Sequence, residues 1–80
     1  MVTYFRRVCV EYLVSKFPYR STDNKLRAAA EKLKAIGGRC ETSDGIHYIS
    51  FEFTTRGRAE KFKAQADLMG LNTELIYTGP

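Results

Sequence analysis

The segment from Ser43 to Gly70 restricts the possible folds of this chain more than any other part of the sequence. Asp44-Gly45 is a preferred pair for a two-residue hairpin turn, because both residue types tolerate positive φ. The turn is followed by Ile46–Phe53, where side chains alternate as in a strand with one buried face. Thr54 or Thr55 then provides a helix cap, and apolar residues recur at helical spacing until the final glycine ends the helix. The sequence therefore predicts a hairpin followed directly by an amphipathic helix.

The two-residue turn also fixes which residues of the hairpin lie opposite each other, because register in a tight hairpin follows from loop length. Counting outward from the turn gives five pairs: Ser43 with Ile46, Thr42 with His47, Glu41 with Tyr48, Cys40 with Ile49, and Arg39 with Ser50. Successive side chains of a strand point to opposite faces. The face predicted to pack on the core therefore consists of His47, Ile49, Phe51 and Phe53.

The N-terminal part of the chain predicts a second strand and helix. From Tyr4 to Val14, β-branched and aromatic residues alternate with other residue types, as in a strand. The following loop contains Pro18 and ends at a helix cap, which is Thr22 or Asp23. Gly37-Gly38 is expected to stop this helix. Its apolar face consists of Leu26, Ala29, Ala30, Leu33 and Ile36.

Two more strands complete the expected order, at Arg39–Ser43 and Leu71–Thr78. Strand, helix, strand, strand, helix, strand is the split β-α-β arrangement of ferredoxin-like α+β domains. Right-handed crossovers then place both helices on one face of an antiparallel sheet with strand order 4-1-3-2. Eighty residues are enough for one small domain, so we expect residues 1–80 to form a single unit.

The overall charge favours an anionic partner. The chain has 13 Lys and Arg against 9 Asp and Glu, a net charge of +4, which is typical of many nucleic-acid-binding domains but not restricted to them. No apolar run is long enough to span a bilayer, and the N-terminal stretch lacks the features of a secretory signal. We therefore expect a soluble cytoplasmic protein without membrane association.

The expected topology gathers basic residues from several elements at one end of the domain. We call this group the basic end cluster; it consists of Arg6, Arg7, Lys34, Arg39, Arg56 and Arg58. Two of its arginines open a helix, where positive charge opposes the macrodipole. An anion bound there would compensate, and the residues expected to hold it are Thr55, Arg56, Gly57 and Arg58. The alternative is that these arginines are solvated and neutralised by Glu52 or Glu60.

The face of the sheet away from the helices is a second candidate surface, called the open face below. Phe5, Ile46 and Tyr48 are expected on it, interleaved with arginine. Aromatic side chains on such a face can stack on single-stranded bases. The same face equally suits a protein partner.

Part of this pattern resembles the RNA recognition motif. The run from Gly45 to Phe51 is similar to that family's third-strand signature, with Tyr48 at a base-stacking position and Ile46 where a second stacking aromatic is usual. The first strand resembles the family in its aliphatic positions only, because Cys9 replaces the stacking aromatic. Asp44 stands where the family usually has a basic residue. The resemblance implies the fold over nearly the whole chain and, through about five residues, RNA binding.

No catalytic or metal centre is predicted. The single histidine, His47, lies on the core face of its strand, and no Ser/His/Asp or Cys/His set is expected around it. Cys9 and Cys40 are expected on opposite faces of the sheet, as free thiols that share neither a metal ion nor a disulfide. We therefore expect a protein that is not an enzyme and has no cofactor.

Two functions stay open at this point. The first is a non-enzymatic module that binds nucleic acid or a nucleoprotein complex through the basic end cluster and the open face. The second is a small protein-binding inhibitor or adaptor, of the stand-alone type that phages encode, which could block a host defence nucleoprotein complex. It would act through the open face, the basic end cluster or an edge strand. The chain is expected to be a monomer or a small homo-oligomer.

Overall fold

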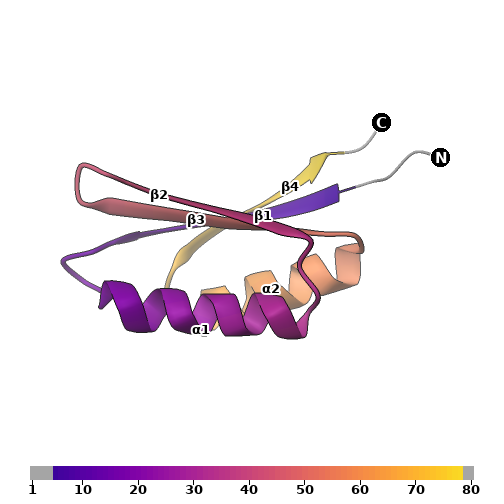
Figure 1. Cartoon of the computed structure of the whole chain (residues 1–80), viewed down its shortest axis with the longest axis horizontal. Helices are drawn as coiled ribbons and strands as arrows, with labels where there is room; N and C mark the ends of the chain where they lie inside the picture. The colour runs from indigo at the N-terminus through magenta and orange to yellow at the C-terminus, as the bar shows by residue number, and fades with distance from the viewer. Residues whose placement is uncertain (1–4, 79–80) are drawn as a thin grey trace.

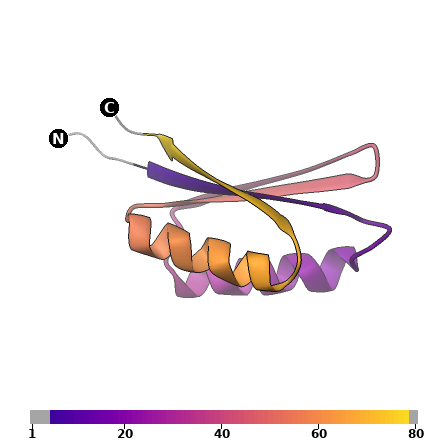
Figure 2. The same cartoon turned by 180° about the vertical axis from the view of Figure 1, so that it is seen from behind.

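The computed structural model describes the backbone of residues 5–78 and the side chains of residues 6–77. Figure 1 shows a single sheet with two helices beneath it, and Figure 2 shows the same layers from behind. The elements follow the predicted order: β1 (Phe5–Leu13), α1 (Tyr19–Lys32), β2 (Gly37–Ser43), β3 (Ile46–Phe53), α2 (Arg56–Leu68) and β4 (Asn72–Thr78). The predicted start of the first strand at Tyr4 lies outside the described residues.

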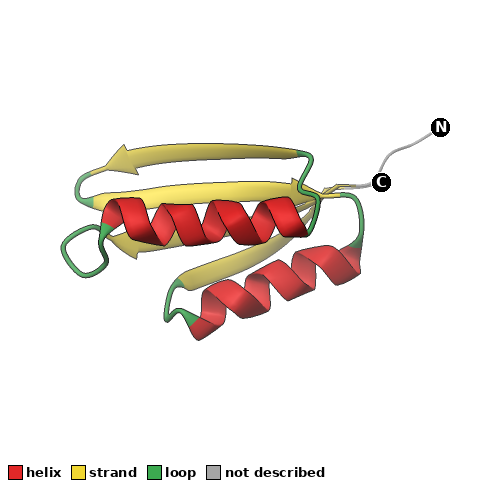
Figure 3. Ribbon diagram, turned by 60° about the horizontal axis from the view of Figure 1, so that its bottom comes forward, coloured by secondary structure: helices red, strands yellow, loops and turns green. Residues whose placement is uncertain are grey.

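The sheet is antiparallel with strand order β2-β3-β1-β4, which is the predicted 4-1-3-2 order read from the other edge. Both helices cover the same face, as Figure 3 shows. This confirms the ferredoxin-like βαββαβ fold. The hairpin register is also confirmed, from Ser43 opposite Ile46 to Arg39 opposite Ser50. Asp44 and Gly45 both have positive φ, at 52° and 77°.

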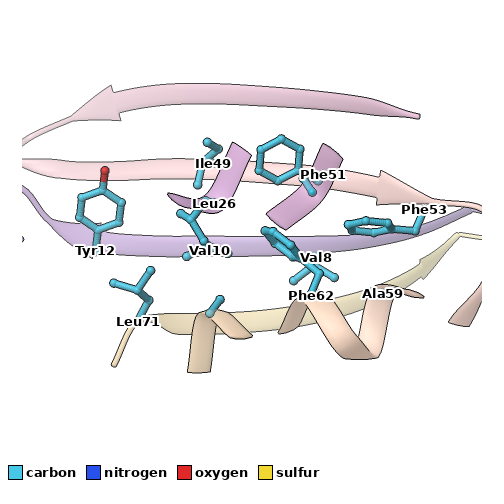
Figure 4. Close-up of a cluster of buried hydrophobic side chains, with 12 residues drawn as sticks. Val8, Val10, Tyr12, Leu26, Ile49, Phe51, Phe53, Ala59, Phe62 and Leu71 are labelled. Carbon is cyan, nitrogen blue, oxygen red and sulfur yellow. The ribbon is translucent and has the colours of Figure 1, made fainter. Parts of the chain in front are cut away.

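The core lies between the sheet and the helices (Figure 4). Phe62 of α2 is fully buried, and its ring contacts Phe51 and Phe53 of β3 at centroid distances of 5.2 and 5.4 Å. The predicted core face of β3 is therefore confirmed. The buried apolar residues are Val8, Val10, Tyr12, Leu26, Ala30, Ile49, Phe51, Phe53, Ala59, Phe62, Ala66 and Leu71.

The predicted start of α1 is wrong by one turn. The helix begins at Tyr19 with Pro18 at the N-cap, and no side chain caps it. Thr22 and Asp23, predicted as caps, are buried inside the helix. The physical reason is tertiary: the carboxylate of Asp23 accepts a hydrogen bond of 2.6 Å from the Tyr12 hydroxyl, so this residue faces the sheet.

The predicted end of α1 is also wrong. The helix ends at Lys32, and Lys34 rather than a glycine takes the left-handed conformation, with φ of 58°. The N–H of Ala35 donates to the carbonyl of Ala30, which is the hydrogen bond of a Schellman motif. Gly37 and Gly38 instead begin β2. Ile36 consequently falls outside the helix and is half exposed.

A lack of space explains why the position of Gly38 in β2 is occupied by glycine. A Cβ atom at this position would come within 2.9 Å of the Phe51 ring on the neighbouring strand. Any larger residue would force that ring to move, and interiors tolerate such overpacking poorly. Gly38 therefore lets β2 pair closely with β3 over the buried Phe51.

Candidate functional site

The elements that carry the basic end cluster meet at one end of the molecule. The starts of β1, β2 and α2 lie there with the end of α1, as Figures 1 and 3 show. The sheet register agrees, because Arg6 is opposite Phe53, and both Arg7 and Gly37 are opposite Glu52. The cluster nevertheless spreads over four places: the open face, the helix side of the sheet, the turn after α1, and the N-terminus of α2.

Arg7 and Glu52 form an ion pair on the open face. The Nε of Arg7 donates to Oε1 of Glu52 at 3.1 Å, and a second guanidinium nitrogen contacts the same oxygen. The hydrogen bond with Glu52 raises the pKa of Arg7. The charge of this arginine is therefore largely compensated, which agrees with the neutralised alternative for this residue.

Arg56 is compensated in the same way, at the start of α2. Its Nε lies 2.8 Å from Oε1 of Glu60, one helical turn further along, and both side chains are exposed. Thr55 is the N-cap, and its hydroxyl accepts a hydrogen bond of 3.3 Å from the N–H of Arg58. The predicted cap is confirmed, and it satisfies one of the N–H groups that an anion would otherwise use.

Arg6 lies on the helix side of the sheet, where its guanidinium stacks over the ring of Tyr77 at 4.8 Å from the centroid. Arg6, Arg56, Leu75 and Tyr77 line a hollow of about 430 Å³. A cation over an aromatic face is stabilised without losing its charge. The guanidinium of Arg6 therefore keeps its positive charge at the wall of this hollow.

The other three members of the cluster have no ion pair within residues 6–77. Lys34 is exposed in the turn after α1, Arg39 is exposed on the open face, and Arg58 is half-buried in the first turn of α2. At Gly57 a Cβ atom would meet nothing within 4 Å, so the backbone at the start of α2 is open to an approaching group.

The open face is less basic than expected. Tyr48 is 40% exposed, but its direct neighbours across the sheet are Glu11 on β1 and Glu41 on β2. Two carboxylates beside the ring would repel the phosphates of a stacked nucleotide. Ile46 is half-buried, and the side chain of Phe5 lies outside the described residues.

A buried polar network was missed by the sequence interpretation, which expected no hydroxyl, imidazole and carboxylate set around His47. Nδ1 of His47 lies 2.7 Å from the Thr42 hydroxyl, and Nε2 lies 2.8 Å from Oδ2 of Asp23. The other oxygen of Asp23 accepts from Tyr12. His47 and Asp23 are only 1% and 5% exposed, so a substrate cannot reach either group directly. The network links α1, β1, β2 and β3.

The sequence contains a signal for this network, but Asp23 also fits the pattern of a helix cap. Asp23 follows Thr22 at the start of a helical pattern, where Asp is common as an N-cap. A histidine and a tyrosine at apolar positions of two adjacent strands, Tyr12 opposite His47, both need a polar partner. Asp23 was the nearby acidic residue that could supply it.

The two cysteines lie on opposite faces, as predicted, and both are free thiols. Burial raises the pKa of the Cys9 thiol on the open face. On the helix side, the Sγ of Cys40 accepts a hydrogen bond from Nη2 of Arg27 at 3.6 Å.

Within the described part of the chain, no group of three or more His, Cys, Asp or Glu is placed to hold a metal ion. In the same residues, no helix is both long and apolar enough to cross a bilayer.

Neither a protein-family model nor a curated protein sequence matches the chain. Solved structures do match its shape. The C-terminal domain of the MgtC protein from Mycobacterium tuberculosis has a TM-score of 0.66 at 13% identity, over 96% of this chain and 89% of that one. The designed protein Foldit4 has a TM-score of 0.65 at 7% identity, over 96% and 97%.

A candidate glycine cleavage system transcriptional repressor has a TM-score of 0.61 at 15% identity and is covered over 49% of its length. Likeness at such low identity shows a shared fold and no more. That a designed protein has the same fold illustrates why the fold by itself does not indicate an activity. The comparisons therefore support a small ferredoxin-like domain, and its function has to be inferred from its own side chains.

Proposed function

We propose that the protein is a non-enzymatic binding module whose basic end cluster contacts the phosphates of a nucleic acid, free or within a nucleoprotein complex. One observation carries the proposal: the cluster contains six basic residues, but only Arg7 and Arg56 have a carboxylate partner within residues 6–77. The cluster therefore keeps an excess of positive charge at one end of the molecule. Such an excess attracts polyanions and binds phosphate by releasing counterions.

The arrangement of the uncompensated residues suits a phosphate chain better than a single ion. Lys34, Arg39 and Arg58 come from three different segments at that end: the turn after α1, β2 and α2. The N–H groups of Arg56 and Gly57 at the start of α2 add donors of the kind that contact phosphate oxygens. Because Tyr48 has Glu11 and Glu41 beside it, the open face would contribute less than the cluster.

The test is a titration of labelled single-stranded RNA, single-stranded DNA and duplex at 50 and 200 mM salt. With three to four phosphate contacts, affinity for a single strand should fall roughly 30-fold between these concentrations. The variant Lys34→Glu/Arg58→Glu should bind at least ~10-fold more weakly and show a shallower salt dependence.

The matched control changes the same number of charges at the far end of the molecule. Lys16 and Arg20 lie in the loop before α1 and in its first turn, and both are exposed. Lys16→Glu/Arg20→Glu should therefore bind nearly as well as the parent. Equal loss in both variants would mean that only net charge matters, and no binding by the parent would refute the proposal.

A protein partner is the second candidate function. It is favoured by the exposure of β2, in which all seven residues are exposed at the edge of the sheet. An inhibitor or adaptor could add a strand there or use the open face. A pull-down that returns one stoichiometric protein, together with no nucleic-acid binding in the titration, would support this candidate over the first.

A further inference from the structure

The edge strand β2 is uncovered on its helix side as well as along its edge. Figure 3 shows α1 lying beneath β3, with β2 extending beyond it. A groove of about 440 Å³ lies between α1 and β2, with Ala30, Ile49 and Phe51 among its lining residues. The residues of β2 on the helix side of the sheet are small: Gly38 and Cys40, which line this groove, and Thr42. A neighbouring strand could therefore approach β2 without meeting a bulky side chain of β2 on this side, where Arg27 of α1 contacts Cys40.

The sheet register shows which backbone N–H and C=O groups of β2 are not used in pairing with β3. Val14 N–H donates to the carbonyl of Gly45, and Ile36 N–H donates to the carbonyl of Glu52. Odd-numbered residues of β3 thus face β1 and even-numbered ones face β2, because backbone groups alternate in direction along a strand. By the register, residues 37, 39, 41 and 43 bond to β3. The N–H and C=O groups of residues 38, 40 and 42 therefore point away from the sheet.

Edge strands of monomeric proteins are commonly protected by lysine, proline or a covering element. β2 contains neither lysine nor proline. Its charged residues are Arg39 and Glu41, which flank Cys40 symmetrically and point to the open face. This order of charges is self-complementary when two copies run antiparallel.

We propose that β2 pairs antiparallel with β2 of a second copy, with Cys40 of each copy on the two-fold axis. In this register Cys40 lies opposite the partner's Cys40, and Gly38 lies opposite the partner's Thr42. All of these residues direct their backbone groups outward, so the pairing forms regular hydrogen bonds. Arg39 lies opposite the partner's Glu41, and Glu41 opposite the partner's Arg39, in pairs whose side chains are closest. The interface is isologous, and the two sheets become one of eight strands.

The other edge does not have this property. On β4 the residues whose backbone points outward include Leu75, since Glu74 and Ile76 are opposite Cys9 and Arg7. Self-pairing about Leu75 would place Glu74 opposite the partner's Ile76, which gives no charge complementarity. The proposal is thus specific to β2. The two proposals share Arg39, which belongs to the basic end cluster and lies in β2. They are tested separately, because Lys34 and Arg58, the residues changed in the binding test, lie outside this strand.

The proposal is tested by measuring self-association of the whole chain by sedimentation velocity, in the parent and in variants that exchange the charges at Arg39 and Glu41. Pairing along one strand buries little area, so we expect a weak dimer with Kd on the order of 0.1 mM. Arg39→Glu and Glu41→Arg each place two like-charged pairs across the axis, and either change alone should weaken self-association at least ~10-fold. The double variant Arg39→Glu/Glu41→Arg restores both attractive pairs and should dimerise like the parent.

Mixing the two single variants provides a sharper test. The Arg39→Glu chain presents two acids and the Glu41→Arg chain presents two bases, so the mixture should form a heterodimer although neither chain pairs with itself. Circular dichroism checks that both variants fold, as expected for exposed positions. A parent that stays monomeric at 1 mM, or a dimer that neither single change weakens, would overturn the proposal.

Cross-linking checks the register independently of charge. In a hydrogen-bonded antiparallel pair the Cα atoms are about 5.5 Å apart, so a short bis-maleimide should join Cys40 to the partner's Cys40 in a Cys9→Ser background. The same reagent should not join Cys40→Ser chains through Cys9, which lies on β1, two strands inward. Adding Arg39→Glu to the Cys9→Ser background should slow the cross-link. Efficient linkage through Cys9 would contradict the register.

Discussion

At the scale of single residues, the network around His47 shows how one buried carboxylate determines the local structure. Asp23 accepts a hydrogen bond from Tyr12 and lies 2.8 Å from the His47 ring, which also contacts Thr42. Buried polar groups cost free energy unless they are paired. The network joins four side chains from four elements, although Nε2 of His47, 2.8 Å from the Asp23 carboxylate, has no hydrogen bond of regular geometry. These contacts explain why Asp23 is inside the helix and not at its cap.

Because of this network, the free energy of unfolding should decrease at alkaline pH. The pKa of Tyr12 is raised well above its ordinary value, first by burial and then by the hydrogen bond to Asp23. In the unfolded chain this tyrosine ionises near pH 10, while in the folded chain it keeps its proton. The unfolded state then binds fewer protons, so the free energy of unfolding falls as pH rises above about 10, by up to ~1.4 kcal/mol per pH unit.

Denaturant titrations between pH 7 and 11 measure this effect. Tyr12→Phe should be less stable by about 1–2 kcal/mol at pH 7, because Asp23 loses a hydrogen bond. It should also lose less stability than the parent above pH 10. Tyr48→Phe, at an exposed position, is the control and should keep the parent's alkaline slope. An unchanged slope in Tyr12→Phe would contradict the assignment.

At the scale of elements, the sequence predicted every helix and strand but not the limits of α1. Strand alternation, the Asp44-Gly45 turn and the cap at Thr55 are local signals, and the structure has each of them. The limits of α1 depend on contacts distant in sequence: Asp23 with Tyr12, and Gly38 with Phe51. Tertiary contacts of this kind override capping preferences. For the candidate site, the sequence predicted which residues gather at one end, but it did not resolve which of Glu52 and Glu60 would pair with which arginine.

The ends of the two helices provide an internal comparison that leads to a prediction. α2 ends with Gly70 at φ of 82°, and α1 ends with Lys34 in the same region, each followed by an N–H that bonds back to the last turn. A residue with a Cβ is strained there, whereas glycine is not. Lys34→Gly should therefore raise the free energy of unfolding by about 1 kcal/mol, measured by denaturant titration.

The control at this position is Lys34→Ala, which removes the charge but keeps the Cβ. It should be no more stable than the parent, since the backbone strain remains. If both variants were equally stable, the strain would not be the cause.

At the scale of the whole molecule, charge is unevenly placed. The basic end cluster lies at one end, whereas the open face around Tyr48 carries Glu11 and Glu41. A polyanion should therefore bind the folded chain at that end, and binding to the folded state alone raises stability. Inorganic polyphosphate at 100 times its Kd should stabilise the protein by about 2.7 kcal/mol, which is roughly 10–20 °C in Tm for a domain of this size.

Differential scanning fluorimetry with and without polyphosphate measures this shift. The Lys34→Glu/Arg58→Glu variant should show a much smaller rise, while Lys16→Glu/Arg20→Glu should show nearly the full one. A rise of the same size in both variants would indicate that the polymer does not select the cluster.

The pairing of Phe5 with Thr78 has a practical consequence for protein engineering. These two positions lie at the same end of the sheet as the basic end cluster, so an affinity tag or fluorophore attached at either terminus would crowd the residues that the binding experiments test. A circular permutant offers a remedy. A short glycine-serine bridge between the two ends, with the chain reopened at Asp44-Gly45, would move every attachment to the opposite tip and leave the arginines unobstructed.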